Sequence, residues 1–455
     1  MQRLTSSPAR FAERTAVVAV VGLGKIGLPL AIQYAQHGRR VIGCDVNPHV
    51  VEAINAGRAH VREEPGLGAA VAEAMAQGTL SATCDTTAAV READVVVVIV
   101  PVMVSDKHEI DFAAVDRASV AIGSGLTSGK LVIYETTLPV GTTVGRLCAL
   151  LERTSRLQAG RDFYLAYSPE RVSSGAIFRD LATYPKVVGG IDTDSAEAAA
   201  MFYSSVLDAE VTRMASASDA EFVKLIETTY RDVNIALANE FARYADRRGL
   251  DVAAAVAAAN TQPYSHIHTS GVGVGGHCIP VYPYFLMHDT DGELSLPQQA
   301  RVINDGMAAY AVQRIEGAIG SLEGCAVLIL GVAYRGDVRE HAFSSARLLQ
   351  AALQARGARA WAIDPLFEDS ELSTMGYTPF PPERAGEVQA IILQADHQGF
   401  SSFDFSRYPN CRVVLDGRWA MSPEVIRRIE ALGMGYLGIG DGQRVAVRAR
   451  ERGAR

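Results

Sequence analysis

A short apolar strand that runs directly into a glycine-rich turn and a helix constrains this chain more than any other feature. Residues 15–21 read TAVVAVV, a run rich in β-branched residues that is typical of a strand buried on both faces. Residues 22–27 read GLGKIG and open an apolar helical segment that is closed by Gly38. A second apolar strand then ends at Asp45. Strand, GxGxxG turn, helix and acid together predict a βαβ unit that binds a dinucleotide.

The residues of this turn suit that purpose. Gly22 permits the tight turn, Gly24 lets the backbone approach a pyrophosphate, and Gly27 allows the helix to pack closely on the strand. Asp45 would accept hydrogen bonds from the adenosine ribose hydroxyls and repel a 2′-phosphate, so we expect NAD rather than NADP. A glycine turn used only for packing is the alternative, and the complete context of the motif argues against it. The expected cofactor-binding residues are Gly22, Gly24, Lys25, Ile26, Gly27, Asp45, Pro101 and Thr137.

The order of the apolar segments predicts an α/β fold class, with two doubly wound, Rossmann-like parallel sheets joined by a central all-helical domain. A stretch without Gly or Pro from residue 218 to residue 248 predicts one long helix in that centre, with Ser218 and Glu221 as its capping box. Strand–helix alternation resumes at Cys325. The expected domains cover residues 1–212, 213–318 and 319–455.

The composition limits the class of protein. Lys and Arg number 43 against 51 Asp and Glu, a net charge of −8, which argues against a general nucleic-acid binder. The apolar run from Val95 to Val104 contains Pro101 and is too short to span a membrane. Six scattered cysteines show no CxxC or other metal-ligand spacing, so we expect reduced thiols and no metal site. With no stretch typical of a secretory signal, these features predict a cytoplasmic protein without nucleic-acid or membrane partners.

Three further stretches carry side chains suited to chemistry. Glu135-Thr136-Thr137 directly follows an expected strand, at the edge of the sheet where such folds bind ligands. Glu170 follows a proline in the loop sequence YSPER. Cys278 comes shortly after a segment with four glycines in six residues, 271–276, which indicates close approach of the backbone to another group. Taken alone, such a cysteine is more often an inert small apolar residue than a nucleophile.

In combination, these stretches resemble the nucleotide-sugar 6-dehydrogenase family, the relatives of UDP-glucose, UDP-N-acetylmannosamine and GDP-mannose dehydrogenases. The resemblance extends from about Val17 to Gly440, and its motifs follow the family's order. These motifs read VGLGKIGLPLA, ETTLPVGTT, YSPERV, EFVKLIETTYRDVNIALANE, GVGVGGHCIPV, LGVAYRGDV and IDP. The SPERV and GHCIPV stretches look more like the N-acetylhexosamine members than the UDP-glucose members.

The resemblance implies a four-electron oxidation of the sugar C6 alcohol to a carboxylate, with two NAD consumed per sugar. Cys278 would attack the intermediate aldehyde, and the thiohemiacetal would be oxidised to a thioester that water cleaves. By match to the family, Lys224 stabilises oxyanions and the thiolate, Glu170 serves thioester hydrolysis, and Thr137 holds a water.

The resemblance also implies a nucleotide-sugar partner, with UDP as the expected nucleotide and the carboxy-terminal domain as its main platform. Lys224, Thr228 and Arg231 share one face of the long helix, a polar stripe that favours a site over an exposed helix charge. The apolar positions of the same helix exceed what one small domain would bury, which predicts a homodimer. The expected substrate-binding residues are Glu170, Arg171, Lys224, Thr228, Arg231, Gly275, Tyr282 and Arg335.

The chain departs from the family pattern at three positions. Thr228 stands where the family has an asparagine, Tyr282 where it has an aspartate, and Ala342 where it has an arginine. A phenol, with an ordinary pKa of about 10, is no carboxylate base at neutral pH. We therefore expect a divergent but active member in which Thr228 and Tyr282 face each other across the C6 site. The alcohol proton would leave through a water on Thr137, with the active-site lysine or glutamate taking part.

Two other functions remain open. Loss of the aspartate favours a two-electron dehydrogenase that releases an aldehyde or keto sugar, whereas retention of Cys278 argues against it. A non-catalytic regulator that binds NAD and a nucleotide sugar would not need the intact cysteine loop. Two, one or no NADH per sugar would separate the three hypotheses.

Overall fold

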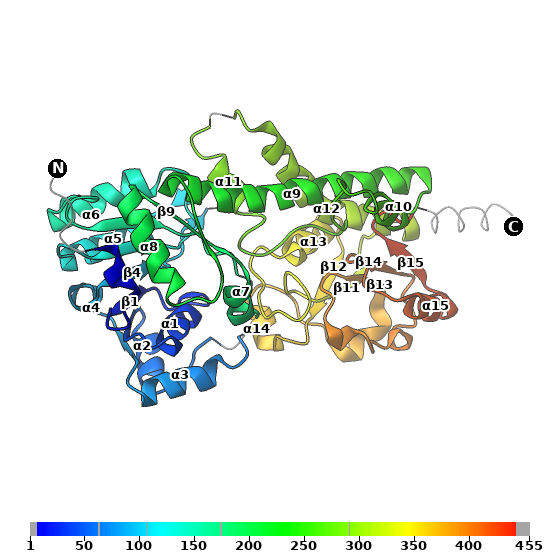
Figure 1. Cartoon of the computed structure of the whole chain (residues 1–455). Helices are drawn as coiled ribbons and strands as arrows, with labels where there is room; N and C mark the ends of the chain where they lie inside the picture. Colours follow the sequence, from blue (N-terminus) through cyan, green and yellow to red (C-terminus); the bar gives the residue numbers. More distant parts are fainter. Residues whose placement is uncertain (1–6, 62–63, 106, 173–174, 291, 443–455) are drawn as a thin grey trace, which may run out of the picture. The chain divides into compact units, whose positions relative to one another are not determined.

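The computed structural model describes residues 7–61, 64–105, 107–172, 175–290 and 292–442 of the chain (Figure 1). The chain divides into two compact units. The first comprises residues 1–227 and 284–288, and the second comprises residues 228–283 and 289–455. The long helix α9 (Ala217–Arg248), green in Figure 1, contributes residues to both units. None of the described helices combines the length and the apolarity that a membrane span needs.

The first unit is built on an eight-stranded sheet in the order β10-β9-β8-β7-β4-β1-β2-β3. Its central strands are short runs of mostly β-branched residues that are buried on both faces, as expected for a sheet covered by helices on each side. The order 3-2-1-4 around β1 is that of a dinucleotide-binding sheet. The strands are β1 (Val18–Val21), β2 (Val41–Cys44), β3 (Leu80–Thr83), β4 (Val95–Val98), β7 (Leu131–Tyr134), β8 (Tyr164–Tyr167), β9 (Lys186–Gly190) and β10 (Val211–Arg213).

One edge of this sheet differs from the wholly parallel arrangement that the sequence predicts. Strand β9 runs antiparallel to β8, with Ala166 opposite Gly190, and β10 runs parallel to β9. The apolar pattern of a strand records which faces are buried but not the direction of the strand, because both directions satisfy the same backbone hydrogen bonding. The reversal brings the amino-terminal end of β9, and with it Lys186, to the carboxyl end of β8.

Helices and a small hairpin complete the first unit. Phe11 of the first helical turn is fully buried and meets Tyr164 edge to face, with 5.4 Å between ring centroids. The helices are η1 (Pro8–Ala12), α1 (Gly27–Gln36), α2 (Pro48–Asn55), α3 (Leu67–Ala76), α4 (Thr86–Glu92), α5 (Ala113–Gly125), η2 (Thr143–Leu147), α6 (Cys148–Ser155), α7 (Ile177–Thr183) and α8 (Thr193–Ser204), and the hairpin pairs β5 (Met103–Val104) with β6 (Ile110–Asp111).

The second unit contains a five-stranded, wholly parallel sheet in the order β12-β11-β13-β14-β15. This 2-1-3-4-5 order is the other common doubly wound arrangement, so the predicted α/β class with two doubly wound domains is confirmed. The strands are β11 (Ala326–Leu330), β12 (Arg359–Ile363), β13 (Val388–Leu393), β14 (Val413–Asp416) and β15 (Gly435–Gly438). The helices around this sheet are α13 (Ser345–Gln354), α14 (Asp369–Thr374), η3 (Pro382–Glu387), η4 (Gln398–Phe400), η5 (Phe405–Arg407) and α15 (Pro423–Ala431).

The central helices share a core with this second sheet. Val327 and Ile329 of β11 lie in one apolar cluster with Ala242 of α9 and with Met307 and Val312 of α12 (Ser295–Ile319). The alternate residues of β11 lie in a separate cluster on the opposite face. The short helices α10 (Val252–Ala259) and α11 (Tyr282–Leu286) lie between α9 and α12 in the sequence.

The long helix is confirmed, but its predicted capping box is wrong. Helix α9 begins at Ala217, and the Ser216 hydroxyl accepts the backbone N–H of Asp219 at 3.1 Å and donates to the Asp219 carboxylate at 2.7 Å. Ser218 therefore lies inside the first turn. The cap falls two residues earlier because Ser216 and Asp219 satisfy the same three-residue spacing as Ser218 and Glu221. Glu221 is left for a different contact.

Candidate active site

In the glycine turn after β1, the first and last glycines pack tightly against the protein, and the middle glycine faces open space. Gly22 has a φ of +96°, and a Cβ there would come within 2.9 Å of the Ile99 carbonyl oxygen. A Cβ at Gly27 would lie 1.8 Å from the Gly22 carbonyl oxygen, so helix α1 reaches β1 only without a side chain. At Gly24, by contrast, a Cβ would meet no described protein atom within 4 Å. Close approach of a ligand to the backbone is therefore possible at Gly24.

Asp45 is held beside this turn. Its Oδ2 accepts the backbone N–H of Leu23 at 3.0 Å, and its Oδ1 accepts the backbone N–H of Asn47 at 2.9 Å. The carboxylate is only half-buried, and each oxygen keeps capacity for a further hydrogen bond. An acid fixed at this height fits the ribose of a dinucleotide whose phosphates lie over Gly24.

The other expected cofactor residues lie on the loops around this turn. Gly24 and Pro101 are exposed, Lys25 and Ile26 are half-buried, and Thr137 is buried. The Thr136 hydroxyl donates to the Val100 carbonyl oxygen at 2.7 Å, which ties the loop after β7 to the loop after β4. The residues present therefore fit a nicotinamide dinucleotide, and the contacts of individual residues with it stay a prediction.

The carboxyl ends of β7 and β8 carry a buried cluster of charge. Lys186 donates to Glu135 Oε2 at 2.9 Å and to Glu170 Oε2 at 3.1 Å. Burial raises the pKa of Glu135 to about 7, although the Lys186 ammonium pulls it down. Burial also acts to raise the pKa of Glu170, but the Lys186 ammonium and several hydrogen bonds outweigh it, so this pKa lies below its usual range. Of the two carboxylates, Glu170 is the one that stays ionised.

Glu221 links the long helix to the loop that carries Thr137. Its Oε2 accepts the backbone N–H of Gly141 at 2.6 Å, and its Oε1 accepts the backbone N–H and the hydroxyl of Thr143 at 2.8 and 2.6 Å. Burial raises the pKa of Glu221 to about 7. Lys224 follows one turn later on α9, and it too is buried. The three donors thus couple the position of α9 near Lys224 to that of the ETTLPVGTT loop.

Arg171, an expected substrate ligand, is engaged within the protein. Its guanidinium forms an ion pair with Glu227 of α9 and donates to the Pro185 carbonyl oxygen at 3.0 Å. These contacts tie the YSPER loop to the long helix. The structure therefore gives Arg171 a positioning task, and a contact with substrate stays a prediction.

In the second unit, the glycine-rich segment before Cys278 packs against the loop that follows β11. A Cβ at Gly275 would lie 2.8 Å from the Tyr334 Cβ and 3.0 Å from the Phe343 carbonyl oxygen. Gly276 has a φ of +92°, and its N–H donates to the Ala342 carbonyl oxygen at 3.0 Å. The close approach that the glycines indicate is therefore an approach to the chain itself, at least on this side of the loop.

The beginning of the segment is anchored to two helices. The N–H of Gly271 donates to Asn239 Oδ1 of α9 at 2.9 Å, and Asn239 Nδ2 donates to Asn304 Oδ1 of α12 at 2.9 Å. Asn304 Nδ2 continues the chain to Asp232 Oδ1 at 2.8 Å, where Arg301 also donates at 2.6 Å. Because all of these side chains are buried, the network fixes the start of the cysteine segment.

Cys278 differs in its surroundings from the buried cysteines Cys44, Cys325 and Cys411. Burial raises the pKa of Cys44 and Cys411 to about 12 and that of Cys148 to about 11, which keeps these thiols protonated and inert. Cys278 is a free, partly exposed cysteine, and its carbonyl oxygen accepts the N–H of Tyr282 at 2.9 Å. Tyr282, the first residue of α11, therefore lies one helical turn after Cys278.

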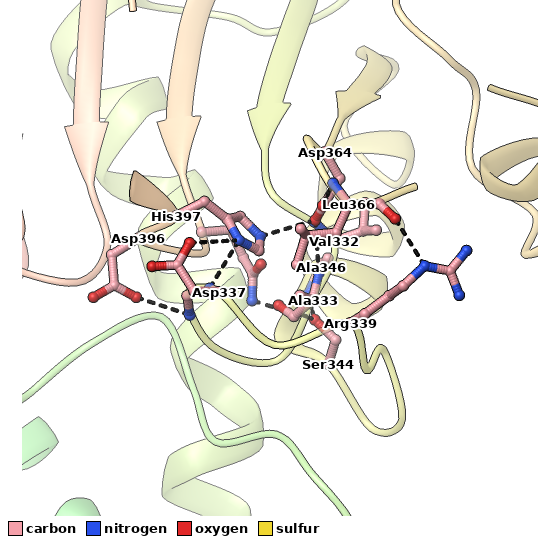
Figure 2. A network of polar contacts seen from close by, with 12 residues as sticks. Val332, Ala333, Asp337, Arg339, Ser344, Ala346, Asp364, Leu366, Asp396 and His397 are labelled. Carbon is pink, nitrogen blue, oxygen red and sulfur yellow. Dashed lines mark hydrogen bonds and ion pairs between the residues drawn. The ribbon is translucent and has the colours of Figure 1, made fainter. Parts of the chain in front are cut away.

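The loop after β11 is held by a buried aspartate, as Figure 2 shows. Asp364, at the end of β12, accepts at Oδ2 the backbone N–H groups of Val332 at 2.7 Å and Ala333 at 3.1 Å. His397 Nε2 reaches the same oxygen at 3.1 Å. His397 Nδ1 accepts the backbone N–H of Asp337 at 2.9 Å, so the proton of the neutral ring is assigned to Nε2. The segment that carries Arg335 is thus pinned on both sides.

The remaining expected substrate residues lie in the second unit. Thr228 is buried on α9, Arg231 is exposed, and Tyr282 is half-buried. Arg335 is exposed and lies over the Tyr334 ring, 5.7 Å from its centroid. That Thr228 and Tyr282 face each other stays a prediction. No group of three or more His, Cys, Asp or Glu among the described residues could hold a metal ion.

Reasoning from the sequence missed the residues that support Glu170 and Cys278. Lys186 and Tyr203 around Glu135, and Asp232 and Arg301 behind the cysteine segment, are separated from their partners by many residues in the sequence. The one available signal was a lysine that precedes the apolar strand sequence VVGG, where a solvated charge is out of place.

Comparisons with known proteins identify relatives of this chain. Three descriptions of the UDP-glucose/GDP-mannose dehydrogenase family match in order: the NAD binding domain at residues 16–207, the central domain at 218–306 and the UDP binding domain at 328–423. A UDP-N-acetyl-D-mannosamine dehydrogenase of Pyrococcus horikoshii is 34% identical over 88% of this chain and 95% of its own length. An NDP-N-acetyl-D-galactosaminuronic acid dehydrogenase of Ralstonia nicotianae is 33% identical over 89% of this chain and 96% of its own length.

Solved structures lead to the same group. The UDP-D-ManNAc dehydrogenase from Pyrococcus horikoshii superposes with a TM-score of 0.84 at 32% identity, covering 94% of this chain and 99% of that one. An NDP-N-acetyl-D-galactosaminuronic acid dehydrogenase from Methanosarcina mazei gives a TM-score of 0.80 at 28% identity, covering 97% and 99%. With three ordered matches and relatives that align along nearly their whole length, the chain belongs to the UDP-glucose/GDP-mannose dehydrogenase family.

Proposed function

We propose that this protein oxidises the C6 primary alcohol of a nucleotide-activated sugar to the uronic acid, with two NAD consumed per sugar. The substrate is a UDP-hexose or UDP-N-acetylhexosamine, and the names of the relatives favour the N-acetylated sugars. The observation that carries the proposal is the contrast between Cys278, a partly exposed thiol on an anchored segment, and Cys44 and Cys411, whose thiols are buried and kept protonated.

The cofactor is held by the open glycine turn. Gly24 and the start of α1 would hold the pyrophosphate, because the backbone is approachable there and the helix dipole favours negative charge. Asp45 accepts the ribose hydroxyls and repels a 2′-phosphate, which selects NAD. Bound NAD supplies the acceptor for the hydrides that leave C6.

The chain's own residues perform the rest of the reaction. Cys278 adds through sulfur to the C6 aldehyde, and the Lys224 ammonium stabilises the oxyanion that forms. After the second oxidation the sugar is a thioester on Cys278. Glu170, kept ionised by its surroundings, removes a proton from the attacking water, the carbon–sulfur bond breaks, and the acid and the thiol are released.

Two further proposals follow for the whole protein. Six large side chains on α9 are 41–52% exposed at successive spacings of 4, 4, 7, 4 and 3 residues: Phe222, Ile226, Tyr230, Leu237, Phe241 and Tyr244. This spacing places them on one face of the helix, and a second copy of the chain would cover them in a homodimer. We place the protein in the cytoplasm, where free cysteines stay reduced.

Light scattering tests the dimer. The wild-type protein should have twice the chain mass of 48.6 kDa, and Phe241→Asp should reduce it to one chain mass. Leu348→Asp is the matched control, because Leu348 is an exposed apolar residue on α13. A monomeric wild type would refute the dimer.

The reaction is tested by counting NADH and product. A panel of UDP- and GDP-sugars, including UDP-N-acetylmannosamine, is incubated with the protein and NAD. The NADH formed is measured, and the molecular mass of the product is determined by mass spectrometry. Two NADH per sugar with a carboxylic acid supports the proposal. One NADH with an aldehyde or keto sugar would favour the two-electron alternative, for which Tyr282 in place of an aspartate is the specific argument. Binding without NADH would indicate a regulator.

A further inference from the structure

The Lys186 ammonium lies between two carboxylates in the interior of the first unit. Its side chain is 6% exposed, and those of Glu135 and Glu170 are 0% and 10% exposed. Such a group is costly to bury, and it persists only if every charge is partnered. Because the proposed reaction assigns a role to Glu170 alone, the purpose of the other two members needs an explanation.

The two carboxylates are held in different ways. Glu135 Oε1 accepts hydroxyl hydrogen bonds from Tyr34 at 3.1 Å and from Tyr203, and Lys186 lies over the Tyr203 ring at 4.9 Å from its centroid. The Glu135 carboxylate is thus surrounded by neutral tyrosine hydroxyls and has no access to solvent.

Glu170 lies at the other end of the group, in a loop. Its Oε1 accepts the backbone N–H groups of Arg171 at 2.6 Å and Val172 at 3.0 Å. A cavity of about 10 Å³, close to the smallest volume that can hold one water molecule, is lined by Glu170 and Lys186 among others. The cavity therefore leaves room for a water beside Glu170, whereas at Glu135 the tyrosine hydroxyls already occupy the carboxylate oxygen.

From this asymmetry we infer that Lys186, anchored by Glu135, is a positioning residue that keeps the Glu170 carboxylate ionised and oriented for thioester hydrolysis. The inference rests on the proposed function. In that step the oxygen of water bonds to the acyl carbon while the bond to the Cys278 sulfur breaks. One proton of the water passes to Glu170 and is then returned to the sulfur, so thioester and water become acid and thiol. A protonated Glu170 could not accept that proton, which is why the ammonium beside it matters.

Other charged groups near this cluster are already paired. Arg171 pairs with Glu227, and Asp180, which lines the same small cavity, pairs with Arg179 at 2.7 Å. The tyrosines at the Glu135 end are neutral at working pH, because burial raises the pKa of both well above its ordinary value. Lys186 is therefore the cation that, together with hydrogen bonds from Glu135 and the Val172 N–H, holds the pKa of Glu170 low against the effect of burial.

The first experiment separates acyl-enzyme formation from its hydrolysis. In Lys186→Met, the first-turnover burst of NADH should stay within about twofold of wild type, while steady-state acid release falls at least about tenfold at pH 7. In a plot of steady-state rate against pH, the rise on the acid side (the acid limb) should move to higher pH by about one unit or more in this variant, because Glu170 then needs a higher pH to ionise. Lys186→Arg should restore the limb. Equal losses of burst and steady state with an unchanged pH profile would show that the cluster is only structural.

Glu135→Gln gives a result of the opposite sign. It removes the carboxylate that competes for Lys186, and the glutamine amide can still donate to Glu170 in place of the Glu135 hydrogen bond that lowers the Glu170 pKa. The acid side of the pH–rate profile should therefore stay where it is or move to lower pH. A limb that moves up in this variant would overturn the inference. Glutamine retains an oxygen for the two tyrosine hydroxyls, so this variant keeps the test decisive even if Lys186→Met does not fold.

A titration of the cofactor-free protein makes the test independent of activity. With ¹³C-labelled glutamate carboxyls, and Glu170 assigned by its loss in Glu170→Gln, the pKa of Glu170 should rise by about one unit or more in Lys186→Met and should not rise in Glu135→Gln. An unchanged pKa in Lys186→Met would refute the positioning role. If wild type forms no acid from any nucleotide sugar, the proposed function fails, and this titration still decides the placement of charge.

Discussion

The two doubly wound sheets of this chain begin with the same local arrangement. In each, the first strand ends in a glycine with positive φ, Gly22 at +96° after β1 and Gly331 at +89° after β11. In each, an aspartate at the end of the second strand, Asp45 or Asp364, accepts the N–H of the residue that follows this glycine, at 3.0 Å and 2.7 Å. Up to this point the turns are equivalent.

The two turns differ in the burial of the aspartate and in its further hydrogen-bond partners. Asp45 is half-buried, and its carboxylate keeps hydrogen-bond capacity for a ligand. The Asp364 side chain is 0% exposed, and its Oδ2 also accepts Ala333 N–H and His397 Nε2, at 3.1 Å each. The same acid is thus left open to a ligand in one sheet and is used up by the protein's own loop in the other. A strand, a glycine and a terminal acid do not identify a dinucleotide site until the neighbours of the acid are known.

The turn after β11, which we call the sealed turn because Asp364 is buried and fully bonded within the protein, supports a neighbouring segment; the turn after β1, with half-buried Asp45, is the open turn. The sealed turn holds the loop after β11, and Tyr334 of that loop fills the space beside Gly275 and Gly276. The turn after β1 therefore leaves room for the proposed cofactor, and the turn after β11 supports the segment that carries the candidate nucleophile. Four variants test this division.

Replacing the nucleophile should have the largest effect. Cys278→Ser should lower acid formation by about a thousandfold or more, because a serine hydroxyl is a far weaker nucleophile than a thiolate. Cofactor affinity, measured by fluorescence titration, should hardly change. Cys44, Cys84, Cys148, Cys325 and Cys411 should tolerate replacement, and exposed Cys84→Ser is the matched control. Acid production at the wild-type rate in Cys278→Ser would refute covalent catalysis.

Removing the charge of the sealed aspartate should lower stability without altering cofactor binding. Asp364→Asn should cost about 2–4 kcal/mol in the free energy of unfolding, since buried N–H donors lose an ionised acceptor. Burial acts to raise the pKa of Asp364, but His397 and backbone hydrogen bonds hold it below its usual value. The stabilisation is therefore present above the unfolded pKa of about 4 and is lost as pH falls below it.

Urea unfolding of wild type and Asp364→Asn at pH 7 and at low pH measures both effects. The two proteins should differ most at pH 7, and the difference should shrink in acid. Loss of dinucleotide affinity with unchanged stability would mean that the second turn, too, binds a dinucleotide.

Changing the open aspartate should alter the choice of cofactor. Wild type should turn over with NAD at least about tenfold better than with NADP, because a carboxylate next to a 2′-phosphate costs 1 kcal/mol or more. Asp45→Asn should narrow that ratio, and Asp364→Asn should leave it as it is. Equal rates of wild-type turnover with both cofactors would remove the ribose role from Asp45.

The smallest effect is expected from the phenol that follows the nucleophile. Tyr282→Phe should lower turnover by about tenfold or less, equivalent to the loss of one hydrogen bond. A drop of several thousandfold in steady-state NADH release would show that the hydroxyl is essential and that the proton of the alcohol leaves through it.

Strands, helices and the cofactor turn could be read from the sequence because each depends on neighbouring residues. The β1 run, the glycines at 22–27 and the thirty-odd residues of α9 without Gly or Pro are local patterns, and the structure has each element where the pattern predicts it. The antiparallel direction of β9 and the 2-1-3-4-5 order of the second sheet could not be read, because strand order and direction depend on pairing between distant segments.

For the candidate site, the sequence by itself determined the residue types: the open glycine turn with its acid, the carboxylate in the YSPER loop, and the cysteine after a glycine-rich segment. Tertiary structure decided their surroundings. Lys186 meets carboxylates 51 and 16 residues away, and His397 meets Asp364 33 residues away. The protonation state of a carboxylate depends on burial and on the nearest charge, and both are set by chain segments that only the fold brings together.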